Sequence, residues 1–231
     1  MSLKTKFSRI VKLRPEESQS FRFLFILSLI TGIALSFYFV AVNSFLIKNT
    51  SVSNLPYAYI ISGLGGVILI KIYQSRQRKV GIVRSYQEFL CIFSVTSLVV
   101  FFAYGKFGHQ PNYAVYLAYF GFLFNMPFTI IFALSFSAIC ARLYNLSQSK
   151  RLLALIGTGE IIASIIGYLF APLISKLLGS SNHLLPVAAI SILPAFFPIY
   201  KLVSDGKEKL AHLPTVKGTL KKLNMAFFLS Q

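Results

Sequence analysis

The sequence predicts an all-α integral membrane protein with six transmembrane helices, from its composition, the length of its apolar segments and the distribution of its charges. Of its 231 residues, 55% are hydrophobic, only 13% are charged, and 23 are phenylalanine. A soluble domain of this length does not need so much apolar sequence. The apolar residues form runs long enough to cross a bilayer, and the cations lie between them. This pattern explains the net charge of +17 without a nucleic-acid partner.

Three spans are expected in the first half of the chain. Pro15, followed by two glutamates, marks the start of the first helix, because proline and acidic residues suit a helix N-terminus. Pro56 opens the second span in the same way, and a glycine-rich stretch inside it suits close helix contact. A basic loop at residues 76–84 precedes the third span. The expected spans are residues 21–47, 55–73 and 86–104.

Three more spans are expected in the second half. The fourth contains Asn125-Met126-Pro127, which predicts a kink and freed backbone carbonyl groups. The basic connection at residues 142–150 leads into the fifth, and the sixth contains three prolines. The expected spans are residues 113–141, 152–178 and 184–202.

Both terminal segments are basic. In residues 1–20, apolar side chains of the first 13 positions share one helical face, which predicts an amphipathic helix on an anionic membrane surface or a disordered basic tail. Residues 203–231 are expected to form a basic cytoplasmic tail or a linker to a further membrane segment. The short apolar run near the end of the tail cannot cross a bilayer.

The distribution of Lys and Arg predicts the orientation. Of the 23 Lys and Arg residues, all but Lys48, Lys106 and Lys176 lie near the two ends of the chain or in the connections after the second and fourth spans. Cytoplasmic loops carry the excess of Lys and Arg. Both termini are therefore expected in the cytoplasm.

The most informative residue is Glu160, the one acidic residue that the predicted spans place within the hydrocarbon depth. A helix that begins near Arg151 puts Glu160 roughly 13 Å inside the membrane. An ionised group there costs at least ~2.5 to 3.5 kcal/mol and usually faces a cavity or a partner. Glu160 is therefore expected either to bind a proton or a solute group, or to tie the bundle together in its protonated form.

Two stripes accompany Glu160 along the fifth span. Ser164 and Tyr168 continue a polar stripe from Glu160 at four-residue spacing. A second stripe consists of small residues, which let another helix approach closely. Its members are Gly159, Ala163, Gly167 and Ala171.

Three further residues are candidates for a solute path. Asn43 and Asn125, on the first and fourth spans, are expected to line it. Arg151, at the cytoplasmic end of the fifth span, is a candidate for binding an anionic solute or for reaching the lipid headgroups. These three join Glu160 and Ser164 as the predicted binding or proton-coupling residues.

Six spans with both ends inside match half of a major-facilitator-type transporter, in which each half is a 3+3 inverted repeat. Three stretches resemble the ATP/ADP translocase-like branch of that superfamily: Arg14-Pro-Glu-Glu, the segment Leu55-Pro-Tyr-Ala-Tyr-Ile, and the segment from Asn145 to Gly159. The resemblance implies transport by alternating access, with nucleotides as one substrate class. It also implies the N-terminal half of a twelve-span protein, or a half that pairs with a second copy. We expect the inner membrane of a bacterium.

No enzyme is expected, because the catalytic motifs are missing and the three histidines are widely separated. The two cysteines lie in separate spans and predict neither a disulfide framework nor a metal site, and no cofactor is expected. The expected partners are the lipid bilayer, a small-molecule solute, and a second copy or second six-span half. The competing hypothesis is a scaffold or sensor subunit without transport activity, which binds a protein partner or anionic lipid at its cytoplasmic face.

Overall fold

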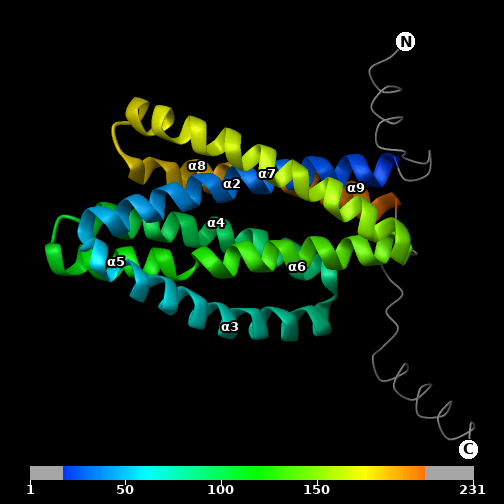
Figure 1. Ribbon diagram of the computed structural model, residues 1–231, viewed down its shortest axis with the longest axis horizontal. Helices are drawn as coiled ribbons and strands as arrows, with labels where there is room; N and C mark the ends of the chain where they lie inside the picture. The colour runs from blue at the N-terminus through cyan, green and yellow to red at the C-terminus, as the bar shows by residue number, and fades with distance from the viewer. Residues whose placement is uncertain (1–17, 206–231) are drawn as a thin grey trace, which may run out of the picture.

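The computed structural model describes residues 18–205, and every regular element in that range is a helix (Figure 1). The predicted all-α class is therefore confirmed for this part of the chain. The predicted amphipathic segment lies almost wholly outside the described range, as does nearly all of the tail. The elements are α2 (Ser18–Asn49), η1 (Val52–Asn54), α3 (Leu55–Val80), α4 (Ile82–Phe107), α5 (Pro111–Leu123), α6 (Asn125–Leu143), α7 (Leu146–Leu177), η2 (Ser181–His183), α8 (Leu184–Ser191), η3 (Leu193–Ala195) and α9 (Phe196–Asp205).

Within residues 18–205, six helical stretches are long and apolar enough to cross a membrane, as expected of an integral membrane protein. Each overlaps one of the predicted spans, and several continue beyond it into polar sequence. The last turn of α3, for example, contains Arg78 and Lys79, whose charges are favourable near a helix C-terminus. The stretches are Ser18–Asn49, Leu55–Val80, Ile82–Phe107, Tyr113–Leu143, Arg151–Leu177 and Ser181–Leu202.

The six spans form one elongated bundle with α2 at its centre. α2 packs along α7 and also contacts α5, α6, α8 and α9, whereas α3 packs against α5 and α6, and α4 against α8. Figure 1 shows the described chain beginning in α2 and finishing in α9 at the same end of the bundle. The α2–α3 and α4–α5 connections lie at the opposite end.

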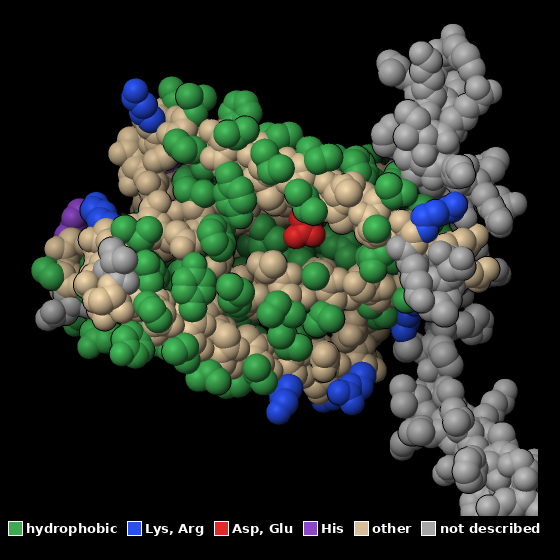
Figure 2. All heavy atoms as spheres, viewed as in Figure 1, with side chains coloured by type: hydrophobic (Ala, Val, Ile, Leu, Met, Phe, Trp, Pro, Cys, Tyr) green, Lys and Arg blue, Asp and Glu red, His purple; other side chains and the backbone are tan. Residues whose placement is uncertain are grey.

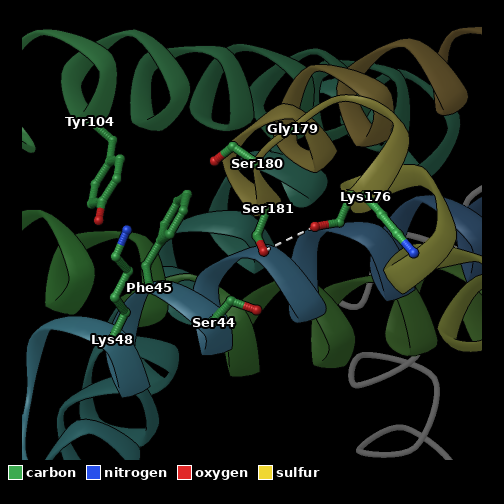
Figure 3. A pocket seen from close by; sticks show the side chains of 9 residues that line it. Ser44, Phe45, Lys48, Tyr104, Lys176, Gly179, Ser180 and Ser181 are labelled. Carbon is green, nitrogen blue, oxygen red and sulfur yellow. Dashed lines mark hydrogen bonds between the residues drawn. The ribbon is translucent and has the colours of Figure 1, made fainter.

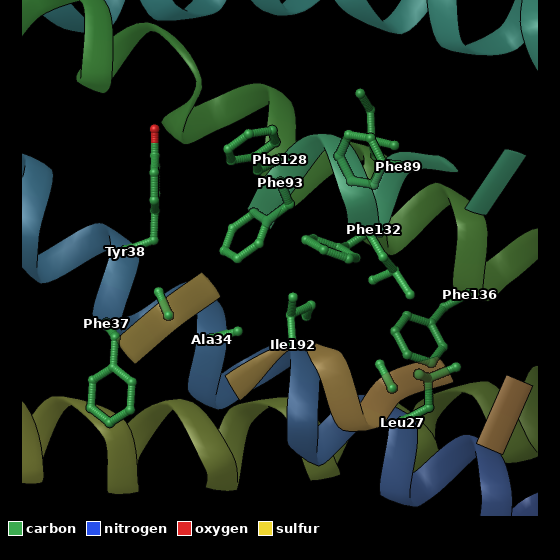
Figure 4. Packing of buried hydrophobic residues seen from close by; sticks show 14 of the residues in the cluster. Leu27, Ala34, Phe37, Tyr38, Phe89, Phe93, Phe128, Phe132, Phe136 and Ile192 are labelled. Atoms are coloured by element: carbon green, nitrogen blue, oxygen red, sulfur yellow. The ribbon is translucent and has the colours of Figure 1, made fainter. Parts of the chain in front are cut away.

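Aromatic rings fill the centre of the bundle (Figure 4). Phe93 of α4 lies with its ring centroid 4.9 Å from that of Phe128 of α6 and 5.5 Å from that of Tyr38 of α2. All three side chains are almost fully buried. Helices in a bilayer associate through van der Waals packing rather than through the hydrophobic effect. Tilted and edge-to-face ring contacts of this kind therefore hold α2, α4 and α6 together.

The fourth span is interrupted, as the Asn125-Met126-Pro127 sequence predicted, and the interruption falls at Phe124 between α5 and α6. Side chains of neighbouring helices bond the backbone there. The Tyr38 hydroxyl of α2 donates to the Gly121 carbonyl at 2.7 Å. Ser62 of α3 donates to the Leu123 carbonyl at 3.1 Å and accepts from the Met126 N–H at 3.2 Å. Irregular backbone at membrane depth requires such partners, because no water is available in the hydrocarbon.

Candidate functional site

Glu160 lies near the middle of α7, whose start is fixed by its own sequence. Asn145 and Gln148 form a capping box in which the Gln148 side chain accepts a hydrogen bond from the Asn145 N–H at 3.1 Å. Such a box satisfies donors that the first turn of a helix leaves free. From this start the helix runs without interruption through Glu160 to Leu177.

The small-residue face of α7 is pressed against α2. Its four small residues, Gly159, Ala163, Gly167 and Ala171, are all buried. A Cβ atom added at Gly32 of α2 would lie 2.5 Å from the Glu160 carbonyl oxygen, and one added at Gly167 would meet the Ser36 side chain. The backbones are thus as close as glycine allows, and this contact fixes the position of Glu160.

Two hydrogen bonds join α2 and α7 on either side of Glu160. The Ser28 hydroxyl donates to the Ile156 carbonyl at 2.8 Å, and the Ser164 hydroxyl donates to the Gly32 carbonyl at 3.3 Å. Ser164, a predicted binding residue, therefore bonds the partner helix, although it lies one turn from Glu160.

The Glu160 side chain is half-buried. Among the described side chains of residues 18–205, none donates a hydrogen bond to its carboxyl group or forms an ion pair with it; the ion pairs there are those of Glu88 with Arg76 and Arg84. Figure 2 shows this face of the molecule covered by apolar side chains, with an acidic side chain in a hollow between two rows of helices. An uncompensated carboxyl group at this depth is expensive, which is the usual mark of a functional position.

Two tyrosine hydroxyls lie within electrostatic range of the Glu160 carboxyl group. One belongs to Tyr168, two turns further along α7, and the other to Tyr86 of α4. Tyr86 is fully buried, its ring packs on Phe132 and Phe136 of α6, and its hydroxyl has no hydrogen-bond partner among the described residues. A buried hydroxyl without a partner costs about 1–3 kcal/mol, so Tyr86, like Glu160, is an uncompensated polar group among the described residues.

A second polar contact joins α3 and α6. The hydroxyls of Tyr73 on α3 and Ser135 on α6 are 2.7 Å apart, and Ser135 also donates to the Ile131 carbonyl at 2.6 Å. Tyr73 is itself within electrostatic range of Tyr86. The four side chains of Glu160, Tyr86, Tyr73 and Ser135, called here the polar cluster, thus come from four different spans.

The structure does not gather the other predicted residues around Glu160. Asn43 donates to the Phe39 carbonyl of its own helix at 2.8 Å, and it lies roughly 16 Å along α2 from Gly32, which touches Glu160. Asn125 is buried at the start of α6, and its amide nitrogen has no partner among the described residues. Arg151 is exposed near the start of α7. The candidates are therefore distributed along the bundle.

Sequence analysis did not select Tyr86, Tyr73 or Ser135. Tyr86 and Tyr73 lie near the ends of their predicted spans, where tyrosine is common because its ring suits the membrane interface. Nothing in the sequence distinguishes them from the chain's other tyrosines. Their buried hydroxyls are the distinguishing signal, and only the packing shows it.

A resident metal has no evident ligands in the part of the chain that the structure describes, where no three His, Cys, Asp or Glu side chains lie together. Comparison of the chain with protein-family models, with curated proteins and with solved structures finds no match. The site and the fold are therefore the features from which a function is inferred.

Proposed function

We propose that this chain is a carrier-type membrane protein that moves a small solute by alternating access, and that Glu160 binds the coupling proton or a polar group of the solute. The observation that carries the proposal is the half-buried Glu160 carboxyl group, which has no hydrogen-bond or ion-pair partner among the described side chains. The buried hydroxyl of Tyr86, also without a partner there, lies within electrostatic range of it. Carboxyl groups within membrane spans mark proton relays and solute paths. Tyr86 is the group we expect to hydrogen-bond the carboxyl group or the solute during transport.

The pairing of the helices supports a carrier fold. The first span packs along the fifth, as α2 along α7, and the fourth packs along the second, as α5–α6 along α3. This pairing would arise if the chain consisted of two units of three spans each and the middle helix of each unit packed within the other unit. We interpret it as a 3+3 inverted repeat. We accordingly propose half of a major-facilitator-type bundle, with both termini in the cytoplasm of a bacterium.

The chemistry of the polar cluster favours a proton, a cation or a neutral hydrogen-bonding solute. The resemblance to ATP/ADP translocase-like proteins suggests a nucleotide, but phosphate recognition calls for charge-assisted contacts from Lys or Arg. Among the described side chains, none of these cations forms an ion pair with Glu160. We therefore assign Glu160 to coupling or to a non-phosphate part of the solute and keep nucleotides as one class to be tested.

A scaffold or sensor subunit is the second candidate, favoured by one observation. A shallow depression of about 400 Å³ lies on the exposed side of α3 and is lined by Lys71, Ser75, Arg76 and Lys79. A basic surface of this kind fits an acidic peptide or an anionic lipid headgroup. A scaffold would lose partner binding when these cations are removed and would show no transport at all.

The test is solute exchange in proteoliposomes that contain the full chain. Uptake of labelled nucleotides, amino acids and cations is measured for the wild type, Glu160→Gln and Tyr86→Phe, with and without a proton gradient. We expect saturable uptake that Glu160→Gln reduces about 100-fold or more, and that Tyr86→Phe reduces about tenfold, as for a lost hydrogen bond to a charged group.

Tyr116→Phe is the matched control, because Tyr116 is 73% exposed and loses the same hydroxyl group away from the polar cluster. Its uptake should equal that of the wild type. Uptake that is unchanged in a folded Glu160→Gln variant would refute the role of Glu160. The absence of uptake for every solute, together with loss of peptide or lipid binding in a Lys71→Gln/Lys79→Gln variant, would establish the scaffold instead.

A further inference from the structure

A pocket of about 480 Å³ lies at the end of the bundle away from Ser18 and Asp205 (Figure 3). Three separate parts of the chain form it: the end of α2, the end of α4 and the α7–η2 connection. Gly179, with φ of +78°, allows the sharp turn between α7 and η2. The pocket is lined by Ser44, Phe45, Lys48, Tyr104, Ser175, Lys176, Gly179, Ser180 and Ser181.

The two lysines of this pocket come from distant parts of the sequence. Lys48 is in the last turn of α2 and Lys176 in the last turn of α7. Only three cations, these two and Lys106, occupy the connections at this end, and two of the three line one pocket. Neither forms an ion pair with a described side chain; the ion pairs among those side chains involve Glu88.

The remaining polar groups of the pocket are hydroxyls with protons to donate. The Tyr104 hydroxyl accepts a hydrogen bond from the Asn49 side chain at 2.9 Å, and the Ser180 hydroxyl accepts one from the Asn182 N–H at 3.2 Å. Each therefore keeps its own proton for another acceptor. The Tyr104 ring is held in place by stacking on Phe45, with centroids 4.2 Å apart.

Figure 3 shows how these groups are arranged. The Lys48 amine lies beside the Tyr104 hydroxyl, and the Ser180 hydroxyl is directed toward the middle of the pocket. Lys176 lies on the other side of Ser181, and its amine is directed away from Ser181 and Lys48 in this view. The Ser181 hydroxyl is 3.2 Å from that of Ser175. Two lysines and several hydroxyl groups thus line the pocket, and no carboxylate lines it.

We propose that this pocket binds a phosphate-bearing anion, between the ends of the first, third and fifth spans. Phosphate oxygens accept several hydrogen bonds at once, and bonds from ammonium groups to an anion are about twice as strong as neutral ones. The C-terminal ends of α2 and α7 carry partial negative charge and by themselves repel an anion. Binding therefore depends on Lys48 and Lys176.

Two sources can supply such an anion: the headgroup of an acidic phospholipid and a free phosphate compound. Both are tested with the full chain in nanodiscs. Discs of phosphatidylcholine alone are titrated with radiolabelled inorganic phosphate. Discs of phosphatidylcholine with phosphatidylglycerol are analysed by native mass spectrometry for the phosphatidylglycerol that remains bound to the released protein.

The variants are Lys48→Gln, Lys176→Gln and the double variant. A charge-assisted hydrogen bond contributes about tenfold in affinity at its lower limit. We therefore expect about tenfold weaker binding for each single variant and about 100-fold for the double variant. Lys106→Gln is the matched control, since Lys106 is exposed at the same end and lies over the Phe107 ring instead of in the pocket.

Lysine-dependent binding of inorganic phosphate would identify a site for free phosphate compounds. Lysine-dependent retention of phosphatidylglycerol without phosphate binding would identify a headgroup site. The proposal is overturned if neither probe binds, or if the double variant binds as well as Lys106→Gln does. Because the three lysines are exposed and substitutions at exposed positions seldom change stability by more than about 0.5 kcal/mol, all variants should fold, and circular dichroism checks this directly.

Discussion

Two helices of the bundle, α7 and α3, are held against their neighbours in different ways. α7 packs along α2 through backbones in direct contact: a Cβ atom at Gly32 would strike the Glu160 carbonyl oxygen. α3 packs along α5–α6 through side chains: a Cβ atom at Gly65 would meet only the flexible end of Leu123, and one at Gly66 would be in ordinary contact with Pro127. The α2–α7 contact is therefore rigid in its spacing, and the α3 contact can adjust.

The two contacts also differ in whether the helices that form them are continuous or interrupted. α2 and α7 are continuous helices, although Pro172 removes one backbone donor from α7, whereas α3 lies against the interruption at Phe124 and supplies Ser62 to it. The carboxyl group of Glu160 is thus carried by the closely packed α2–α7 pair, while the adaptable backbone lies in the fourth span. A change of shape in the bundle is easier at the α5–α6 interruption than at the α2–α7 contact.

The largest expected effect is that of Gly32→Ala, which should lower the free energy of unfolding by about 2–3 kcal/mol because overpacking forces two backbones apart. Gly65→Ala should change it by less than about 1 kcal/mol, since a side chain can move aside. Unfolding by titration with dodecyl sulfate in mixed micelles measures both. Gly157→Ala on α7 is the control, because its added methyl group meets nothing within 4 Å. Equal losses for Gly32→Ala and Gly65→Ala would remove the distinction between the two contacts.

The next effect is that of Ser62→Ala, which should cost about 1–2 kcal/mol. The substitution leaves the Leu123 carbonyl and the Met126 N–H without the partner that Ser62 provides, and unsatisfied buried groups are expensive. The same titration measures it. Ser137→Ala is the matched control, because the Ser137 hydroxyl is exposed and bonds only within its own helix. A Ser62 variant as stable as the Ser137 variant would contradict the role assigned to this side chain.

The smallest effect is that of Ser28→Ala on the α2–α7 side, about 0.6 kcal/mol, the average for hydrogen bonds between membrane helices. Ser28 bonds the Ile156 carbonyl of a continuous helix, which keeps its helical hydrogen bond when the serine is removed. Ser28 and Ser62 thus make similar bonds with different consequences. A Ser28→Ala loss larger than that of Ser62→Ala, in the same titration, would reverse the comparison.

Sequence reasoning reached part of the candidate site. It selected Glu160, because one acidic residue inside a long apolar segment is conspicuous. It also located the interruption near Asn125-Met126-Pro127, because proline inside a membrane span usually kinks or breaks the helix. It did not bring Tyr86 to Glu160, since the two belong to different spans. It also grouped Asn43, Asn125 and Ser164 with Glu160, whereas the structure bonds Ser164 to α2 and leaves the two asparagines elsewhere along the bundle.

By itself, the sequence determined the helical class, the six apolar stretches and the place of Glu160 inside one of them, because the length and hydropathy of a segment are local properties that a bilayer selects directly. Only the tertiary structure decided that the glycine face of α7 meets Gly32, that Ser62 reaches the interrupted span, and that Lys48 and Lys176 line one pocket. Which span neighbours which depends on the fit of side chains and backbones across the whole bundle, and no local pattern along the chain encodes that fit.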